Sequence, residues 1–368
     1  MARERLDRYL RALTDAEGSD LHVKAGSPPR VRVNGTLHRL EREDPITAEL
    51  TADIAMAIMR PDMYEHFERN HEADFAYAID GLGRFRVNVF RQRGSVAMIL
   101  RRVRTDPARF DDLGLPEVVG RLAGEHRGLV LVTGPTGSGK TTTLAAMIDW
   151  INRNREVHIL TIEDPIEVLH RDELASINQR EIGVDTRDFA VAMRSVMRQD
   201  PDVILVGEMR DEETVSAALT AAETGHLVLS TLHTIDAPET INRIVDFFPP
   251  HQQGQVRATL AGSLKGTICQ RLVATSDGEA RVAVVEVMVV NGRIQQCILD
   301  PQQAGDIQAI IADGEYYGMQ TFDQHLVKLY ERGVIDWAGA LRVASNPHDL
   351  RIMLQQRGIV GAGAGRTS

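Results

Sequence analysis

The sequence predicts a protein of two joined domains, a small α+β domain with an antiparallel sheet and a larger α/β domain with a parallel sheet. Three observations support this fold class. Over roughly the first hundred residues, short runs alternate between apolar and polar side chains, as strands with one buried face do. From Gly128 onward, apolar β-branched runs alternate with helical segments, which is typical of buried parallel strands. Between these two patterns, residues 105–118 contain two prolines and several acidic residues, which indicates a linker.

The small domain is predicted to cover residues 1–104 and to begin with an amphipathic helix over 3–16. Alternating runs flank Asn34-Gly35, a dipeptide that favours a type I′ turn, so we expect a hairpin over 30–40. Residues 47–70 have a helical pattern. Three more strands are predicted over 73–79, 84–91 and 95–103.

The large domain is predicted to cover residues 119–357. Its strands are expected over 129–133, 157–162, 203–206 and 227–231, and its helices over 139–153, 187–199 and 212–223. An edge hairpin is expected over 281–290, helices over 304–356, and a disordered Gly/Ala-rich tail over 358–368. Because the carboxyl ends of parallel strands meet at one edge of a sheet, we expect ligands at that edge.

One motif lies between the strand over 129–133 and the helix that follows it. The run GPTGSGKTT matches the phosphate-binding pattern G-x-x-x-x-G-K-[ST]. Its glycines let backbone N–H groups point at phosphate oxygens, Lys140 can reach the β- and γ-phosphates, and the Thr141 hydroxyl can bind Mg²⁺. The strand before and the helix after it argue against a plain Gly-rich turn. The predicted nucleotide-binding residues are Gly134, Pro135, Thr136, Gly137, Ser138, Gly139, Lys140, Thr141 and Thr142.

Carboxylates follow two other predicted strands. Glu163 and Asp164 could hold Mg²⁺ or a water of its shell, although a solvated acidic turn is an equal alternative. Glu208 follows the strand over 203–206 after one glycine, in the arrangement called Walker B. There it can orient or deprotonate the water that attacks a γ-phosphate, and the alternative is a cap of the next helix.

Two histidines and two arginines complete the set of candidates. His226 and His233 flank the strand over 227–231, and we expect His233 to be a γ-phosphate or interface sensor. For His226, a structural and a nucleotide-binding role stay equally open. Arg86 and Arg101 lie on adjacent predicted strands of the small domain. Nucleotide hydrolases often need such a positive charge, supplied in cis or by a neighbour, to stabilise the transition state.

Composition excludes several classes of protein. The 368 residues carry a formal net charge of −10, which argues against a dedicated binder of nucleic acid or anionic membranes. The only two cysteines, Cys269 and Cys297, rule out a disulfide framework and a four-cysteine metal site. We find neither an apolar run long enough to span a bilayer nor a secretory signal at the start. We therefore expect a cytoplasmic protein that meets membranes only through partners.

Seven motifs together resemble the secretion ATPase superfamily, and within it the type IV pilus retraction (twitching motility) ATPases of the PilT/PilU branch. They are GSDLHV at 18–23, GRFRVN at 83–88, the phosphate loop at 134–142, IEDPIE at 162–167, RQDPD at 198–202, GEMRD at 207–211 and TGHLV at 224–228. The resemblance implies a PAS-like N-terminal domain, a RecA-like ATPase domain and a homohexamer that uses ATP and Mg²⁺. It also implies a place at the cytoplasmic face of the inner membrane, on the pilus platform protein.

The resemblance further assigns roles to individual residues. It implies that Glu163 lies in the Asp box, that Glu208 is the catalytic glutamate, and that His226 and His233 form the His box. Arg86 and Arg101 match arginines that the N-terminal domain presents to nucleotide.

One departure concerns the C-terminal part of the chain. Retraction motors that act alone carry an Ala-Ile-Arg-Asn-Leu-type helix where this chain reads DIQAIIADG, and the segments 318–324 and 345–351 look more like the accessory PilU-like branch. We expect a hexameric motor that couples ATP hydrolysis to pilus retraction. The alternatives are an accessory or regulatory nucleotide-binding subunit that assists a second pilus motor, and a pilus-extension or type II secretion ATPase. Those last relatives usually carry an extra N-terminal domain and a tetracysteine insert.

Overall fold

The chain divides into two compact units. The structure is a computed structural model that describes residues 2–41, 43–103, 105 and 107–357, so the predicted tail lies outside the described residues. The N-terminal unit comprises residues 1–106 with 167–169, and the C-terminal unit comprises 107–166 and the chain from 170 onward.

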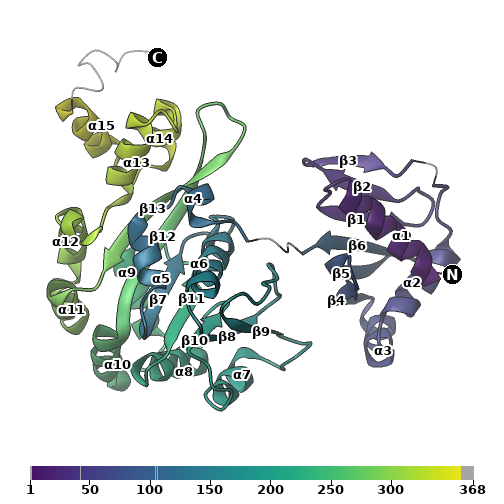
Figure 1. Ribbon diagram of the computed structural model, residues 1–368, viewed down its shortest axis with the longest axis horizontal. Coiled ribbons are helices and arrows are strands. Elements are labelled where there is room, and N and C mark those ends of the chain that lie inside the picture. Colours follow the sequence, from purple (N-terminus) through teal and green to yellow (C-terminus); the bar gives the residue numbers. More distant parts are fainter. Residues whose placement is uncertain (1, 42, 104, 106, 358–368) are drawn as a thin grey trace. The chain divides into compact units, whose positions relative to one another are not determined.

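The N-terminal unit is a six-stranded antiparallel sheet with helices (Figure 1). Its strand order is β3-β2-β1-β6-β5-β4. Leucines of α1 share one buried core with Phe85, Val87 and Val89 of β5. The elements are α1 (Ala2–Asp15), β1 (Asp20–Lys24), β2 (Arg30–Val33), β3 (Thr36–Arg39), α2 (Ala48–Ile58), α3 (Pro61–Asn70), β4 (Glu72–Ile79), β5 (Gly83–Gln92) and β6 (Ser95–Arg102).

The predicted hairpin is confirmed, because β2 and β3 pair across Asn34 and Gly35, whose φ values are 47° and 80°. The helical pattern over 47–70 is confirmed, but it forms two helices, α2 and α3. Pro61 begins a second helix there, and the residue before it, Arg60, is extended because a proline ring disfavours helical backbone in its neighbour. We also did not predict β1, which lies between β2 and β6.

The C-terminal unit contains a seven-stranded sheet in the order β13-β12-β7-β11-β10-β8-β9 (Figure 1). Its strands are parallel except β13, which pairs antiparallel with β12. The strands are β7 (Gly128–Thr133), β8 (His158–Glu163), β9 (Ser176–Glu181), β10 (Val203–Val206), β11 (Leu227–Leu232), β12 (Leu264–Ala274) and β13 (Arg281–Val289).

Helices flank this sheet and follow it. The helices that precede β7 or connect the strands up to β12 along the chain are α4 (Phe110–Leu113), α5 (Glu117–Ala123), α6 (Lys140–Asn154), α7 (Phe189–Val196), α8 (Glu212–Glu223), α9 (Ala237–Asp246) and α10 (Pro250–Ser263). Those after β13 are α11 (Gly292–Leu299), η1 (Pro301–Asp306), α12 (Ile307–Ala312), η2 (Glu315–Tyr317), α13 (Phe322–Glu331), α14 (Trp337–Val343) and α15 (Pro347–Gln356). Among the described residues, we find no helix whose length and apolar character would let it cross a bilayer.

Both faces of the central strands are covered. Leu129 and Leu131 of β7 join one apolar core, while Val130 and Val132 join another with residues of α5 and α6. Part of the predicted linker belongs to this packing, since Val118 of α5 is buried. With their side chains used for packing, these strands can offer functional groups only at their ends.

Candidate active site

The phosphate loop connects β7 to α6 and requires glycine at three positions. Gly134, Gly137 and Gly139 have φ values of 141°, 79° and 92°, a region that other residues rarely adopt. A Cβ atom on Gly134 would lie 2.3 Å from the Gln270 carbonyl oxygen and 2.7 Å from Ser138 Oγ. The loop is therefore curled against its surroundings, and its conformation depends on glycine.

Lys140 lies at the start of α6 and folds back over this loop. Its Nζ donates to the carbonyl oxygens of Gly134 at 2.8 Å and Pro135 at 3.2 Å. Ser138 Oγ is buried and has no hydrogen-bond partner in the described part of the chain. Phosphate oxygens would satisfy that hydroxyl and the backbone N–H groups at the helix start, so the loop fits a nucleotide.

Gln270 of β12 supports the loop, and sequence reasoning missed it. Its Oε1 accepts a hydrogen bond from the Thr143 hydroxyl at 2.9 Å. Its Nε2 lies 2.8 Å from the position that a Cβ on Gly139 would take. No local signal could have found this residue, because it lies 127 positions from Thr143 along the chain.

Glu163 ends β8, and its carboxylate is buried. Oε1 accepts hydrogen bonds from Thr161 Oγ1 at 2.6 Å and Gln179 Nε2 at 3.1 Å. Gln179 Oε1 accepts in turn from the His170 backbone N–H at 2.9 Å, and burial lowers the pKa of His170 to about 4. These contacts hold the carboxylate at the strand end. Its predicted part in binding Mg²⁺ stays a prediction.

Glu208 follows β10 and is held from two sides. Arg210 donates to Oε2 at 2.7 Å, and His233 Nε2 lies 3.1 Å from Oε1. The backbone beneath is anchored to both neighbouring strands, since Gly207 N–H donates to Ile162 and Thr231 Oγ1 donates to Gly207. The structure thus brings two predicted residues together and adds Arg210, which the GEMRD motif contains.

The phosphate loop and Glu208 share one edge of the sheet. Only β11 separates β10 from β7, so their ends lie about 10 Å apart at the usual strand spacing. A triphosphate held on the loop can therefore extend toward the carboxylate. Among the described residues, the protein offers no cluster of three or more His, Cys, Asp or Glu side chains that could hold a metal alone.

His226 is separated from this edge. It precedes β11, and its carbonyl accepts from Gly128 N–H at the start of β7. A six-residue strand measures about 20 Å, so His226 lies too far from the phosphate loop of its own chain to bind the same phosphates. Its Nδ1 lies 3.0 Å from the Ala221 carbonyl oxygen, which is a structural contact.

Arg86 and Arg101 lie on the adjacent strands β5 and β6 of the N-terminal unit, as the sequence predicted, and the structure pairs them directly. Both are exposed. Arg101 Nε donates to Asp20 Oδ1 at 2.8 Å, whereas the Arg86 side chain extends from the same face of the sheet. Their predicted approach to a nucleotide stays a prediction.

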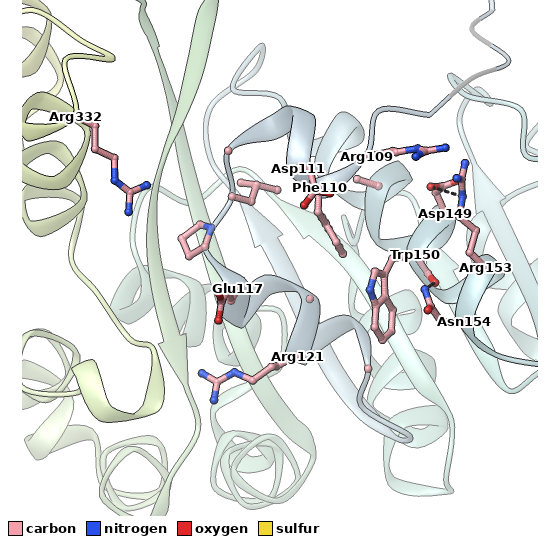
Figure 2. A pocket seen from close by; sticks show the side chains of 16 residues that line it. Arg109, Phe110, Asp111, Glu117, Arg121, Asp149, Trp150, Arg153, Asn154 and Arg332 are labelled. Atoms are coloured by element: carbon pink, nitrogen blue, oxygen red, sulfur yellow. Dashed lines mark hydrogen bonds and ion pairs between the residues drawn. The ribbon is translucent and has the colours of Figure 1, made fainter.

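A groove of about 880 Å³ lies elsewhere, between the α4–α5 segment and the last turns of α6 (Figure 2). Phe110 lies there beside Gly120 of α5, and Trp150 lies beside Gly124, the residue that caps the end of α5. Trp150 lies ten residues beyond the start of α6, about 15 Å along the helix axis from the phosphate loop. We conclude that this groove is separate from the nucleotide edge.

Comparisons with known proteins agree with this geometry. Residues 2–329 match the family described as type II/IV secretion system protein. The type IV pilus ATPase PilU of Pseudomonas aeruginosa is 41% identical over 349 residues, which covers 95% of this chain and 91% of that protein. The type IV pilus retraction ATPase PilT of the same organism is 44% identical over 331 residues, covering 90% of this chain and 95% of that protein.

A solved structure shows the same fold. The crystal structure of the pilus retraction motor PilT with bound ADP superimposes with a TM-score of 0.85 at 44% identity, covering 94% of this chain and 98% of that one. The fold, the phosphate loop and these similarities together show that the chain belongs to the type II/IV secretion system protein family.

Proposed function

We propose that this protein is the ATPase motor of type IV pilus retraction, which underlies twitching motility. The observation that carries the proposal is the placement of Glu208, held by His233 and Arg210, at the sheet edge that also carries the phosphate loop. The relatives PilT and PilU, named for pilus ATPase activity, support the assignment over more than four fifths of the chain.

The residues of the site divide the work of ATP hydrolysis. The loop N–H groups and Lys140 hold the phosphates, and Glu208 orients a water whose oxygen attacks the γ-phosphorus as the bond to ADP breaks. Glu208 accepts the proton of that water, while His233 and Arg210 fix the direction of its carboxylate. Mg²⁺, for which Thr141 is the predicted ligand and Glu163 a support, would neutralise charge on the phosphates.

Assembly completes the proposal. We infer a homohexamer in which the N-terminal unit of one subunit brings Arg86 or Arg101 to the nucleotide of a neighbour. The ring would act at the cytoplasmic face of the inner membrane on the pilus platform protein. The segment at 306–314 supports a second possibility, an accessory motor that works beside another retraction ATPase.

The activity is tested with the purified chain and two variants. Lys140→Ala should abolish ATPase activity by removing a phosphate contact, whereas Glu208→Gln should bind ATP with near-normal affinity and hydrolyse it at least about 10²-fold more slowly. Nucleotide titration and phosphate release separate these outcomes. If Glu208→Gln hydrolyses within about threefold of wild type, Glu208 is not the base.

The direction of work is tested in cells. A deletion strain should keep its pili and lose twitching or retraction force, and the wild-type gene should restore it where Lys140→Ala does not. Residual twitching with reduced force would favour the accessory role. A strain without pili that only the active gene rescues would reverse the assignment to pilus extension.

A further inference from the structure

A carboxylate lies buried in the C-terminal unit away from the nucleotide edge. Glu286 of β13 is 2% exposed and shares its strand face with Val284 and Met288, within the larger apolar core. Burying a carboxyl group in apolar surroundings lowers stability unless hydrogen bonds compensate. The hydrogen bonds of the Glu286 carboxyl group therefore decide how much of this cost is offset.

Glu286 joins two helices. Oε1 accepts from the backbone N–H of Ala237, the first residue of α9, at 3.0 Å. Oε2 accepts from Gln308 Nε2 in α12, also at 3.0 Å. One side chain on the edge strand of the sheet therefore holds the start of α9 and the side of α12 together.

Charged neighbours of Glu286 act in opposite directions on the ionisation of its carboxyl group. Asp236 at the cap of α9 repels its negative charge, and Arg271 of β12 attracts it. Cys269 lies directly opposite on β12, and His325 of α13 contacts the backbone of the neighbouring residue Val285. Burial raises the pKa of Glu286 to about 7, and the N–H groups of its two partners offset only part of that rise.

A short, internally bonded segment connects Ala237 to the active site. Thr234 Oγ1 lies 2.7 Å from Thr240 Oγ1, and Ile235 N–H donates to Glu239 Oε2 at 2.9 Å. His233 begins this segment and contacts Glu208 at 3.1 Å. Because these bonds attach the segment to α9, the position of the first residue of α9 determines where His233 lies.

We infer that Glu286 is a positioning residue that couples α12 to the active site, by holding the start of α9 and thereby His233 and Glu208. The inference rests on the proposed ATPase function. It predicts that the rate of hydrolysis depends on how α12 packs, so a partner that moves α12 would change the rate without touching nucleotide.

Glu286→Gln tests the coupling, because glutamine keeps the shape and mimics the protonated acid. At pH 8 we expect kcat to fall about fivefold, the rate equivalent of about one hydrogen bond, with KM for ATP nearly unchanged. The ratio of wild-type to variant kcat should decline toward one at pH 6, because the wild-type carboxyl then carries a proton. Thermal denaturation at the same pH values reports stability separately, and we expect the variant to be at least as stable at pH 8.

Gln308→Leu removes only the contact with α12 and should lower kcat in the same direction by a smaller factor. Gln303→Leu is the matched control. Gln303 lies in η1, the segment before α12, and its Nε2 donates to Asp300, which caps η1. The control should keep the wild-type rate. A control variant as slow as Gln308→Leu would show a general packing effect and overturn the coupling.

The outcomes separate the two proposals. A wild-type chain that hydrolyses no ATP overturns the proposed function and the coupling with it. An active wild type with unchanged kcat and pH profile in Glu286→Gln and Gln308→Leu overturns the coupling alone. Lower melting temperatures with unchanged kcat would assign Glu286 a structural role, which also contradicts the inference.

Discussion

The two sheets of this protein present functional groups in different ways. In the N-terminal unit, Phe85, Val87 and Val89 of β5 are buried, while Arg84 and Arg86 alternate with them on the other face. In the C-terminal unit, β7, β10 and β11 are buried over their whole length. The antiparallel sheet can therefore act through a face, whereas the parallel sheet can act only through its ends.

The open face of the antiparallel sheet is strongly basic. One row across it runs Ala76, Arg86, Arg101, Asp20 and Arg32, each paired with the next in register. Further basic residues of this face are Lys24, Arg30, Arg39 and Arg84. In a chain of net charge −10, such a face favours an anionic ligand, as the proposed contact with a neighbour's nucleotide requires.

Among the variants that test this comparison of the two sheets, the largest loss of kcat should follow from removing two arginines of the basic face. We expect Arg86→Ala with Arg101→Ala to lower kcat by about 10³-fold or more, as loss of an arginine finger does. Mixing that chain with Glu208→Gln should restore some activity, because each variant supplies what the other lacks. Phosphate release from mixed rings is the measurement.

Arg39→Ala, on the outer strand of the same face, is the control and should keep its activity. If the mixture never exceeds the two parent variants, although mass measurements show mixed rings, the arginines do not act between subunits. In that case the basic face of the antiparallel sheet would not act on a neighbour's nucleotide, and its anionic ligand would be a different one.

A smaller loss of kcat should distinguish substitutions at the two ends of β11. His233→Ala removes a contact with Glu208, so we expect kcat to fall about tenfold, as when a hydrogen bond to a charged group is lost. His226→Ala, at the amino end of the strand, should change kcat less than about twofold and act on stability alone. Equal losses of kcat in the two variants would show that function is not confined to the carboxyl ends.

The smallest effect concerns Asp20 in the basic row. Burial opposes its ionisation, but hydrogen bonds from Ser19 and Arg101 outweigh this and hold the pKa of Asp20 below its ordinary value of 3.8. Its stabilising contribution is therefore present above pH 3.8 and is lost as pH falls through the lower folded-state value. Asp20→Asn should lower the melting temperature by a few degrees at pH 7, and the difference should shrink in acid.

The Asp20→Asn experiment needs only calorimetry of the two chains at several pH values. A difference that stays constant down to pH 2.5 would show that hydrogen-bond geometry, and not the charge on Asp20, stabilises the row.

Local sequence was enough to predict most of the fold. The alternation in β4, β5 and β6, the Asn34-Gly35 turn and the glycines of the phosphate loop each depend on neighbouring residues. Besides β1 of the N-terminal unit, two strands of the C-terminal unit escaped prediction because their residues are not apolar in a regular way. The β9 strand, SINQRE, is polar at a sheet edge, and β12 follows directly on the helix α10.

By itself, therefore, the sequence determined the two fold classes, the phosphate loop and the strand ends that carry Glu163, Glu208 and His233. Only the tertiary structure decided which of these meet. His233 at the end of β11 contacts Glu208 after the neighbouring strand β10, while Glu286 reaches partners 49 and 22 positions away. The physical reason is that helix and strand patterns follow from neighbours in sequence, whereas these contacts depend on strand order and on how helices pack across the sheet.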